Sequence, residues 1–203
     1  DGLVPATAPE GADLVVVNTC AFIEEARQES GDVILGLAER KAAAAELVIT
    51  GCLAERYGAD LAEALPEADA VAGFGVPVTL GPTRQGGATP VPAFDLLNLP
   101  RPAPAAPWAY VKVAEGCDRA CAFCAIPSFR GKQRSRAPET IETEARDLVE
   151  RGAAELVLVA QDLAWYGRDA GEAGSLTPLL RRLDALSEHG LARIRLLYLY
   201  PSE

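Results

Sequence analysis

The chain has 203 residues, of which 49% are hydrophobic and 24% charged, and its formal net charge is -10. This length fits one large domain or two small ones, and the composition is that of a globular protein. No apolar run approaches the roughly 20 residues that a membrane helix needs, and no secretory leader is recognisable. The acidic net charge argues against a nucleic-acid partner and is compatible with a basic protein partner. We therefore expect a cytoplasmic protein with no membrane partner.

Strands and helices alternate in the first third of the chain. Short runs rich in β-branched residues predict strands over residues 13–20, 46–52 and 68–74. Between them, apolar residues recur at helical spacing from Phe22, and a second helix is expected over residues 53–65. The apolar residues at this helical spacing are Phe22, Ile23, Ala26, Val33, Ile34 and Leu37. Strands separated by helices predict a parallel sheet with right-handed crossovers.

A proline-rich stretch over residues 77–107 predicts a linker, because dense proline blocks helices and central strands. Strands are then expected over 109–114, 155–160 and 194–199, with a long polar loop at 115–137. Pro138 should open one helix that stops at Gly152, and Ser175 should cap another that stops at Gly190. The predicted domains are residues 1–76 and 108–203, the second forming a parallel sheet or barrel.

Five cysteines fit poorly with a closed set of disulfides, so metal binding or catalysis is the expected use of these thiols. The sequence contains no methionine, even at position 1, and it starts in a loop-like stretch. We therefore expect a fragment of a longer protein.

The strongest chemical signal is the pattern C-x3-C-x2-C at Cys117, Cys121 and Cys124. Three thiolates on one short loop can hold three irons of a cubane cluster and leave the fourth iron open for S-adenosylmethionine. Structural zinc normally takes four Cys or His ligands, and a ferredoxin supplies a fourth cysteine. The only histidine, His189, is distant in sequence, so both alternatives are disfavoured.

Cys20 and Cys52 each end a predicted strand, at the sheet edge where ligands bind. They could share a metal site, or they could be ordinary buried cysteines. Gln161 and Asp162 likewise follow a strand, and could line an active site or simply begin a polar loop.

The basic run formed by Arg130, Lys132, Arg134 and Arg136 could meet the carboxylate of the cofactor or an acidic group of a substrate. The alternative is a solvated surface, which is the usual role of such runs.

Residues 117–136 (CDRACAFCAIPSFRGKQRSR), 18–20 (NTC) and 51–57 (GCLAERY) resemble the radical S-adenosylmethionine (radical SAM) methylthiotransferases. The resemblance implies a Rossmann-like α/β domain followed by the first half of a radical SAM partial TIM barrel. It also implies two [4Fe-4S] clusters: one at the three-cysteine loop, the other at Cys20, Cys52 and a cysteine before Cys20 that this sequence lacks. Phe123, Gln161 and Asp162 are expected to contact S-adenosylmethionine.

Two branches of that family differ in substrate. Residues 160–163 (AQDL), 165–167 (WYG) and 196–201 (LLYLYP) look like the branch that modifies an aspartate on the twelfth protein of the small ribosomal subunit. The resemblance implies transfer of a methylthio group to the aspartate β-carbon, with flavodoxin or ferredoxin as electron donor. The alternatives are the branch that modifies a transfer-RNA adenosine, an electron-transfer module, and an inactive iron–sulfur fragment.

Overall fold

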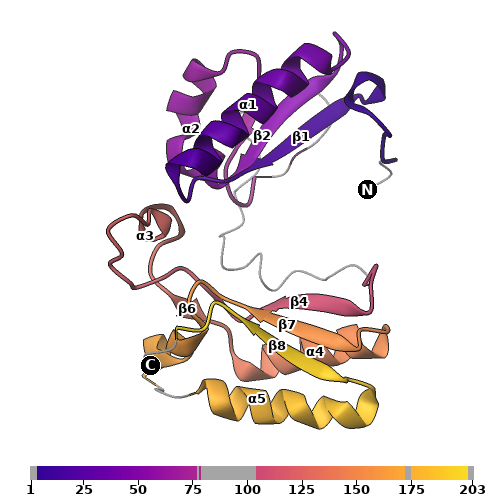
Figure 1. The fold of residues 1–203 in the computed structure, drawn as a ribbon, viewed down its shortest axis with the longest axis vertical. Coiled ribbons are helices and arrows are strands. Elements are labelled where there is room, and N and C mark those ends of the chain that lie inside the picture. Colours follow the sequence, from indigo (N-terminus) through magenta and orange to yellow (C-terminus); the bar gives the residue numbers. More distant parts are fainter. Residues whose placement is uncertain (1–3, 77, 79–103, 172–174, 201–203) are drawn as a thin grey trace. The chain divides into compact units, whose positions relative to one another are not determined.

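A computed structural model describes residues 4–76, 78, 104–171 and 175–200 (Figure 1). The chain divides into two compact units, one formed by residues 1–96 and 120–129 and the other by residues 97–119 and 130–203. Most of the predicted linker at 77–107 lies outside the described residues, so the predicted domain boundaries stay predictions. None of the described helices has the length and apolarity to span a membrane.

The first unit is built on a parallel sheet with the strand order β1-β2-β3. Its strands are β1 (Leu14–Thr19), β2 (Glu46–Gly51) and β3 (Ala70–Ala72), and a short 3-10 turn, η1 (Pro9–Gly11), precedes them. Two crossover helices join the strands: α1 (Glu24–Arg40) and α2 (Cys52–Ala64). This arrangement confirms the expected succession of parallel strands and helices.

The hydrophobic core of the first unit lies on the sheet face covered by the helices. Val15 and Val17 of β1 point into it, whereas Val16 between them is 46% exposed, as strand alternation requires. The first helix begins later than the expected start at Phe22. The helix begins at Glu24 after an extended Ile23, and Phe22, Ile23 and Val33 are exposed. Periodicity identifies apolar positions, but only tertiary contacts decide which of them are covered.

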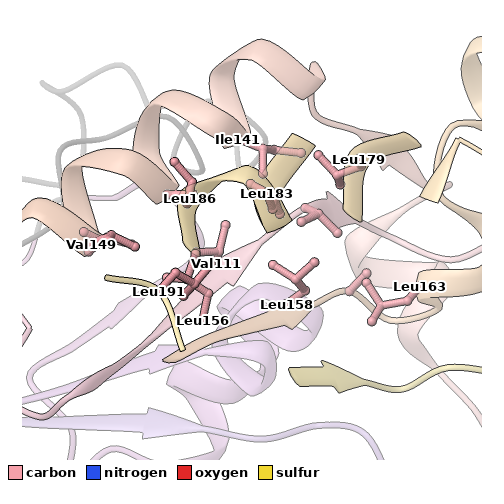
Figure 2. Close-up of a cluster of buried hydrophobic side chains, with 14 of the residues drawn as sticks. Val111, Ile141, Val149, Leu156, Leu158, Leu163, Leu179, Leu183, Leu186 and Leu191 are labelled. Atoms are coloured by element: carbon pink, nitrogen blue, oxygen red, sulfur yellow. The ribbon is translucent and has the colours of Figure 1, made fainter. Parts of the chain in front are cut away.

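The second unit contains a parallel sheet with the order β4-β7-β8. Its strands are β4 (Trp108–Lys112), β7 (Glu155–Val159) and β8 (Arg193–Leu197). The helices are α4 (Pro138–Glu150) and α5 (Leu176–Asp184), with 3-10 turns η3 (Leu163–Trp165), η4 (Arg168–Ala170) and η5 (Ala185–His189). The helices cover one sheet face, so that leucines of α5 meet β7 across the core in Figure 2.

Helix boundaries in the second unit follow the sequence signals with two exceptions. The helix expected to stop at Gly190 ends at Asp184, and the 3-10 turn η5 continues from there to Gly190. Pro138 opens α4, and Gly152 and Gly190 adopt the left-handed backbone that ends a helix, with φ of 103° and 106°. The other exception is the predicted side-chain cap at Ser175, which is wrong. Ser175 has helical backbone angles and makes no capping hydrogen bond, since a capping side chain needs an extended backbone.

The region expected to be a long loop, residues 115–137, contains elements that are too short to produce a periodic pattern in the sequence. They are β5 (Ala114–Glu115), α3 (Ile126–Arg130) and β6 (Arg134–Ser135). The overall class, α/β with parallel sheets, is as predicted.

Candidate functional site

Residues 116–133, here called the cluster loop, carry the three-cysteine motif and are closed at their base by β5 and β6. These strands pair antiparallel, with Glu115 opposite Arg134. Inside that ladder the backbone N–H of Cys117 donates to the carbonyl of Gly131 at 3.1 Å. The start of the motif is therefore tied to the returning chain in the second unit.

Gly116 makes this closure possible. Its φ is +83°, and a Cβ at this position would lie 2.1 Å from the Lys132 carbonyl oxygen. Only glycine combines this backbone conformation with so close an approach of another backbone.

Glu115 is a buried anion at the same base, only 3% exposed. Its carboxylate accepts hydrogen bonds from Arg130 Nη1 at 2.7 Å and Gln161 Nε2 at 3.1 Å, and it also pairs with Lys112. Burial by itself raises the pKa of Glu115, but the charges and hydrogen bonds of Lys112 and Arg130 outweigh it, leaving the pKa below its ordinary value. Glu115 is therefore a carboxylate at neutral pH and joins both ends of the cluster loop to the end of β7.

The three cysteines of the motif differ in exposure. Cys117 is 8% exposed, Cys121 is exposed, and Cys124 is half-buried, with its N–H on the Cys121 carbonyl at 3.0 Å. None of the five cysteines, all of which lie in the described part of the chain, forms a disulfide. Three thiols within eight residues are a donor set that fits an iron–sulfur cluster. Among the described residues no three His, Cys, Asp or Glu side chains converge as metal ligands, so the ligand assignment stays a prediction.

Cys20 and Cys52 follow neighbouring strands at the carboxyl edge of the first sheet. Thr19 lies opposite Gly51 in the β1–β2 register, and each cysteine comes directly after one of these residues. The buried Thr19 hydroxyl donates to the Thr50 carbonyl at 2.6 Å and accepts from the N–H of Leu53 at 3.3 Å, which fixes the start of α2. Cys20 is exposed, which disagrees with the buried alternative for this residue. Cys52 is half-buried and packs against the hydrophobic core of the first unit.

We expect Gly51→Ala to lower the free energy of unfolding by about 2–3 kcal/mol. Gly51 has φ of +93°, and a Cβ there would lie 2.4 Å from Asn18 Oδ1 and 2.5 Å from the Thr19 carbonyl oxygen. Urea unfolding of the cluster-free chain measures the effect. The control is Gly36→Ala in α1, where a Cβ would meet no described atom within 4 Å, and it should raise stability by about 0.5–1 kcal/mol. Equal effects of both substitutions would contradict the prediction.

The expected cofactor contacts have different surroundings. Phe123 is 73% exposed. Gln161 donates to Glu115, and its Oε1 is buried without a hydrogen-bond partner among the described residues. Both carboxylate oxygens of Asp162 are engaged, one by Arg119 Nε at 2.8 Å and the other by the N–H of Ala164 at 3.0 Å.

The basic run is not a solvated surface at two of its positions. Arg130 pairs with Glu115, and Arg136 is 3% exposed, with its Nη1 at 2.7 Å from both Glu144 Oε2 and the Lys112 carbonyl oxygen. These two guanidinium groups are engaged by partners within the second unit.

Sequence reasoning missed Glu115 and Arg119. The guanidinium carbon of Arg119 lies 4.4 Å from the centre of the Trp165 ring and 4.6 Å from that of Tyr200. No local pattern reveals such contacts, because their partners come from elements far apart in the sequence.

Two parts of the chain match known protein families. Residues 1–73 match the Uncharacterized protein family UPF0004, and residues 111–197 match the Radical SAM superfamily. The first match contains all strands of the first sheet, and the second contains β7 and β8. The parallel strands of the second unit are consistent with part of a radical SAM barrel, and the matched superfamily implies S-adenosylmethionine and a [4Fe-4S] cluster as cofactors.

Relatives over nearly the whole chain carry the name ribosomal protein uS12 methylthiotransferase RimO. The protein from Trichlorobacter lovleyi is 45% identical over 94% of this chain and 44% of its own length. The protein from Geobacter sulfurreducens is 46% identical over 94% of this chain and 45% of its own length. The protein from Kineococcus radiotolerans is 39% identical over 96% of this chain and 48% of its own length. The chain thus spans about half the length of these relatives.

Proposed function

We propose that this chain is part of a radical SAM methylthiotransferase that attaches a methylthio group to the β-carbon of an aspartate on ribosomal protein uS12. The similarity to RimO proteins across both units carries this proposal. The ribosomal-protein substrate is also compatible with the acidic net charge of -10, because ribosomal proteins are generally basic.

Cys117, Cys121 and Cys124 would hold the radical cluster, leaving one iron for S-adenosylmethionine. When bound, this pair supplies the 5′-deoxyadenosyl radical that removes a hydrogen atom from the aspartate β-carbon. The polypeptide contributes the closed base of the cluster loop, which limits the positions that the first thiolate can take. Phe123, Gln161 and Asp162 would border the cofactor, and the buried Gln161 Oε1 is an acceptor suited to one of its donor groups.

A second cluster would use Cys20 and Cys52 at the edge of the first sheet and present the sulfur that is transferred. The family pattern places a further ligand before Cys20, where residues 1–19 contain no cysteine. Within residues 1–203 this second site is therefore incompletely ligated. Reduced flavodoxin or ferredoxin would supply electrons, in the cytoplasm.

The substrate can be tested with a chimera in which this chain replaces the matching part of the Geobacter sulfurreducens relative. After anaerobic reconstitution, it is incubated with S-adenosylmethionine and either uS12 or transfer RNA, and the products are weighed. We expect the mass of a methylthio group on uS12 alone, and none with the control variant Cys117→Ala. A gain on transfer RNA alone would favour the transfer-RNA enzyme. No gain on either substrate would favour an electron-transfer module or an inactive fragment.

A further inference from the structure

The side chain of Arg119, which lies in the cluster loop between the first two cysteines, is held on several sides within the second unit. Its Nε donates to Asp162 Oδ2 at 2.8 Å, and the Asp162 side chain is only 5% exposed. The rings of Trp165 and Tyr200 both lie within stacking range of the guanidinium. A planar guanidinium engaged in this way loses little further freedom and is well defined in position.

The backbone of the same residue contacts the first cysteine. The N–H of Arg119 donates to Cys117 Sγ at 3.4 Å. Hydrogen bonds to thiolate sulfur stabilise the negative charge that an iron–sulfur cluster gains on reduction, and they are among the factors that set its potential.

These two contacts form a chain from the end of β7 to a predicted cluster ligand. We propose that Asp162 is a positioning residue: by holding the side chain of Arg119, it keeps the Arg119 backbone N–H on the sulfur of Cys117. This inference rests on the proposed function, since it assumes a cluster at Cys117. It assigns a role to the hydrogen bond from Arg119 to Cys117, which the spacing of the cysteines does not reveal.

Asp162 is suited to this task because its own position is fixed independently. Its Oδ1 accepts from the N–H of Ala164 and so caps η3, while its Oδ2 faces Arg119. The carboxylate is thereby tied to the backbone directly after β7, the most buried strand of the sheet.

Arg119→Lys is the decisive variant, because it keeps the charge but removes the flat, forked group that can stack and pair at once. The test uses the whole chain with Cys20→Ala and Cys52→Ala, so that only the cluster-loop site can hold iron. After anaerobic reconstitution, we would measure cluster release to a chelator, the midpoint potential, and the electron paramagnetic resonance spectrum with and without S-adenosylmethionine.

We expect Arg119→Lys to release its cluster about tenfold faster than the same Cys20→Ala, Cys52→Ala chain with Arg119 intact. Such a change is typical for loss of a group that supports a metal ligand. Its midpoint potential should become more negative, because the N–H donor to Cys117 is no longer held in place. Asp162→Asn, which can still cap η3, should also accelerate release, and the double variant should be no faster than either single one.

The matched control is Arg195→Lys. Arg195 pairs with Glu155 through its Nε at 2.7 Å, at the opposite, amino-terminal end of β7. It should change neither release nor potential, and the cluster-free forms of both lysine variants should melt within a few degrees of each other.

If Arg119→Lys matches Arg195→Lys in release and potential while both bind a cluster that responds to S-adenosylmethionine, the positioning role is wrong and the proposed function stands. If the chain with only Cys20→Ala and Cys52→Ala takes up no such cluster, the cluster assignment to Cys117, Cys121 and Cys124 fails, and this inference fails with it.

Discussion

Replacing Cys117, Cys121 and Cys124 with alanine is expected to abolish the cluster that binds S-adenosylmethionine. Thiolates are the only side chains in the motif that ligate such clusters, and no other cysteine lies within the loop at residues 116–133. Anaerobic reconstitution with iron and sulfide, followed by reduction and electron paramagnetic resonance, should show no cubane signal that shifts on addition of S-adenosylmethionine.

The matched control is the double variant Cys20→Ala and Cys52→Ala. It removes the cysteines of the other proposed site, at the edge of the β1–β2 sheet, and should keep the response to S-adenosylmethionine. A response that survives loss of the loop cysteines would refute the ligand assignment. Zinc without sulfide in the unsubstituted protein would remove the radical mechanism altogether.

Gly116→Ala should have the largest effect of any single alanine substitution in the base of the cluster loop. A Cβ at this position would lie 2.1 Å from the Lys132 carbonyl oxygen and 2.7 Å from that of Gly131, and both are backbone atoms that no side-chain rotation can move. The left-handed backbone, with φ of +83°, adds strain of about 1–2 kcal/mol. We expect the free energy of unfolding to fall by about 3 kcal/mol or more, as seen by urea unfolding of the cluster-free chain.

Gly131→Ala separates the effect of backbone strain from the effect of the steric clash at Gly116. Gly131 also has a left-handed backbone, with φ of +74°, but a Cβ there would meet no described atom within 4 Å. Its substitution should therefore cost only the backbone strain of about 1–2 kcal/mol. If Gly116→Ala were no more destabilising than Gly131→Ala, the close approach at the loop base would not matter for stability.

The two substitutions should also differ in cluster binding. Opening the base would separate Cys117 from Gly131, whose backbone groups bond at 3.1 Å, and displace the first thiolate. We expect Gly116→Ala to lose cluster content and Gly131→Ala to retain most of it, as measured by iron and sulfide analysis.

Much of the fold followed from local patterns. The existence of β1, proline at the start of α4 and the left-handed Gly152 after it depend on residues within a few positions of one another, and the sequence alone predicted them. The cysteine motif is equally local, because a ligand set on one short loop is specified by spacing and residue type.

Other features depended on partners that are distant in the sequence. The exposure of Phe22 and Val33, the short strands β5 and β6, and the burial of Arg136 could not be inferred from periodicity or charge runs. An apolar face is buried only where another element covers it, and a charge can be buried only where its counter-ion lies.

The contacts that hold the cluster loop in place also depend on residues that are distant in the sequence. Arg119 and Asp162 are 43 positions apart, and Glu115 and Gln161 are 46 apart. They meet because β7 pairs with β4 and delivers Gln161 and Asp162 to the edge from which the cluster loop extends. The sequence by itself determined which residues can ligate a cluster, since ligand chemistry resides in side-chain type and spacing. Only the tertiary structure decided what holds that loop in place, because ion pairs and stacking require contacts that strand order creates.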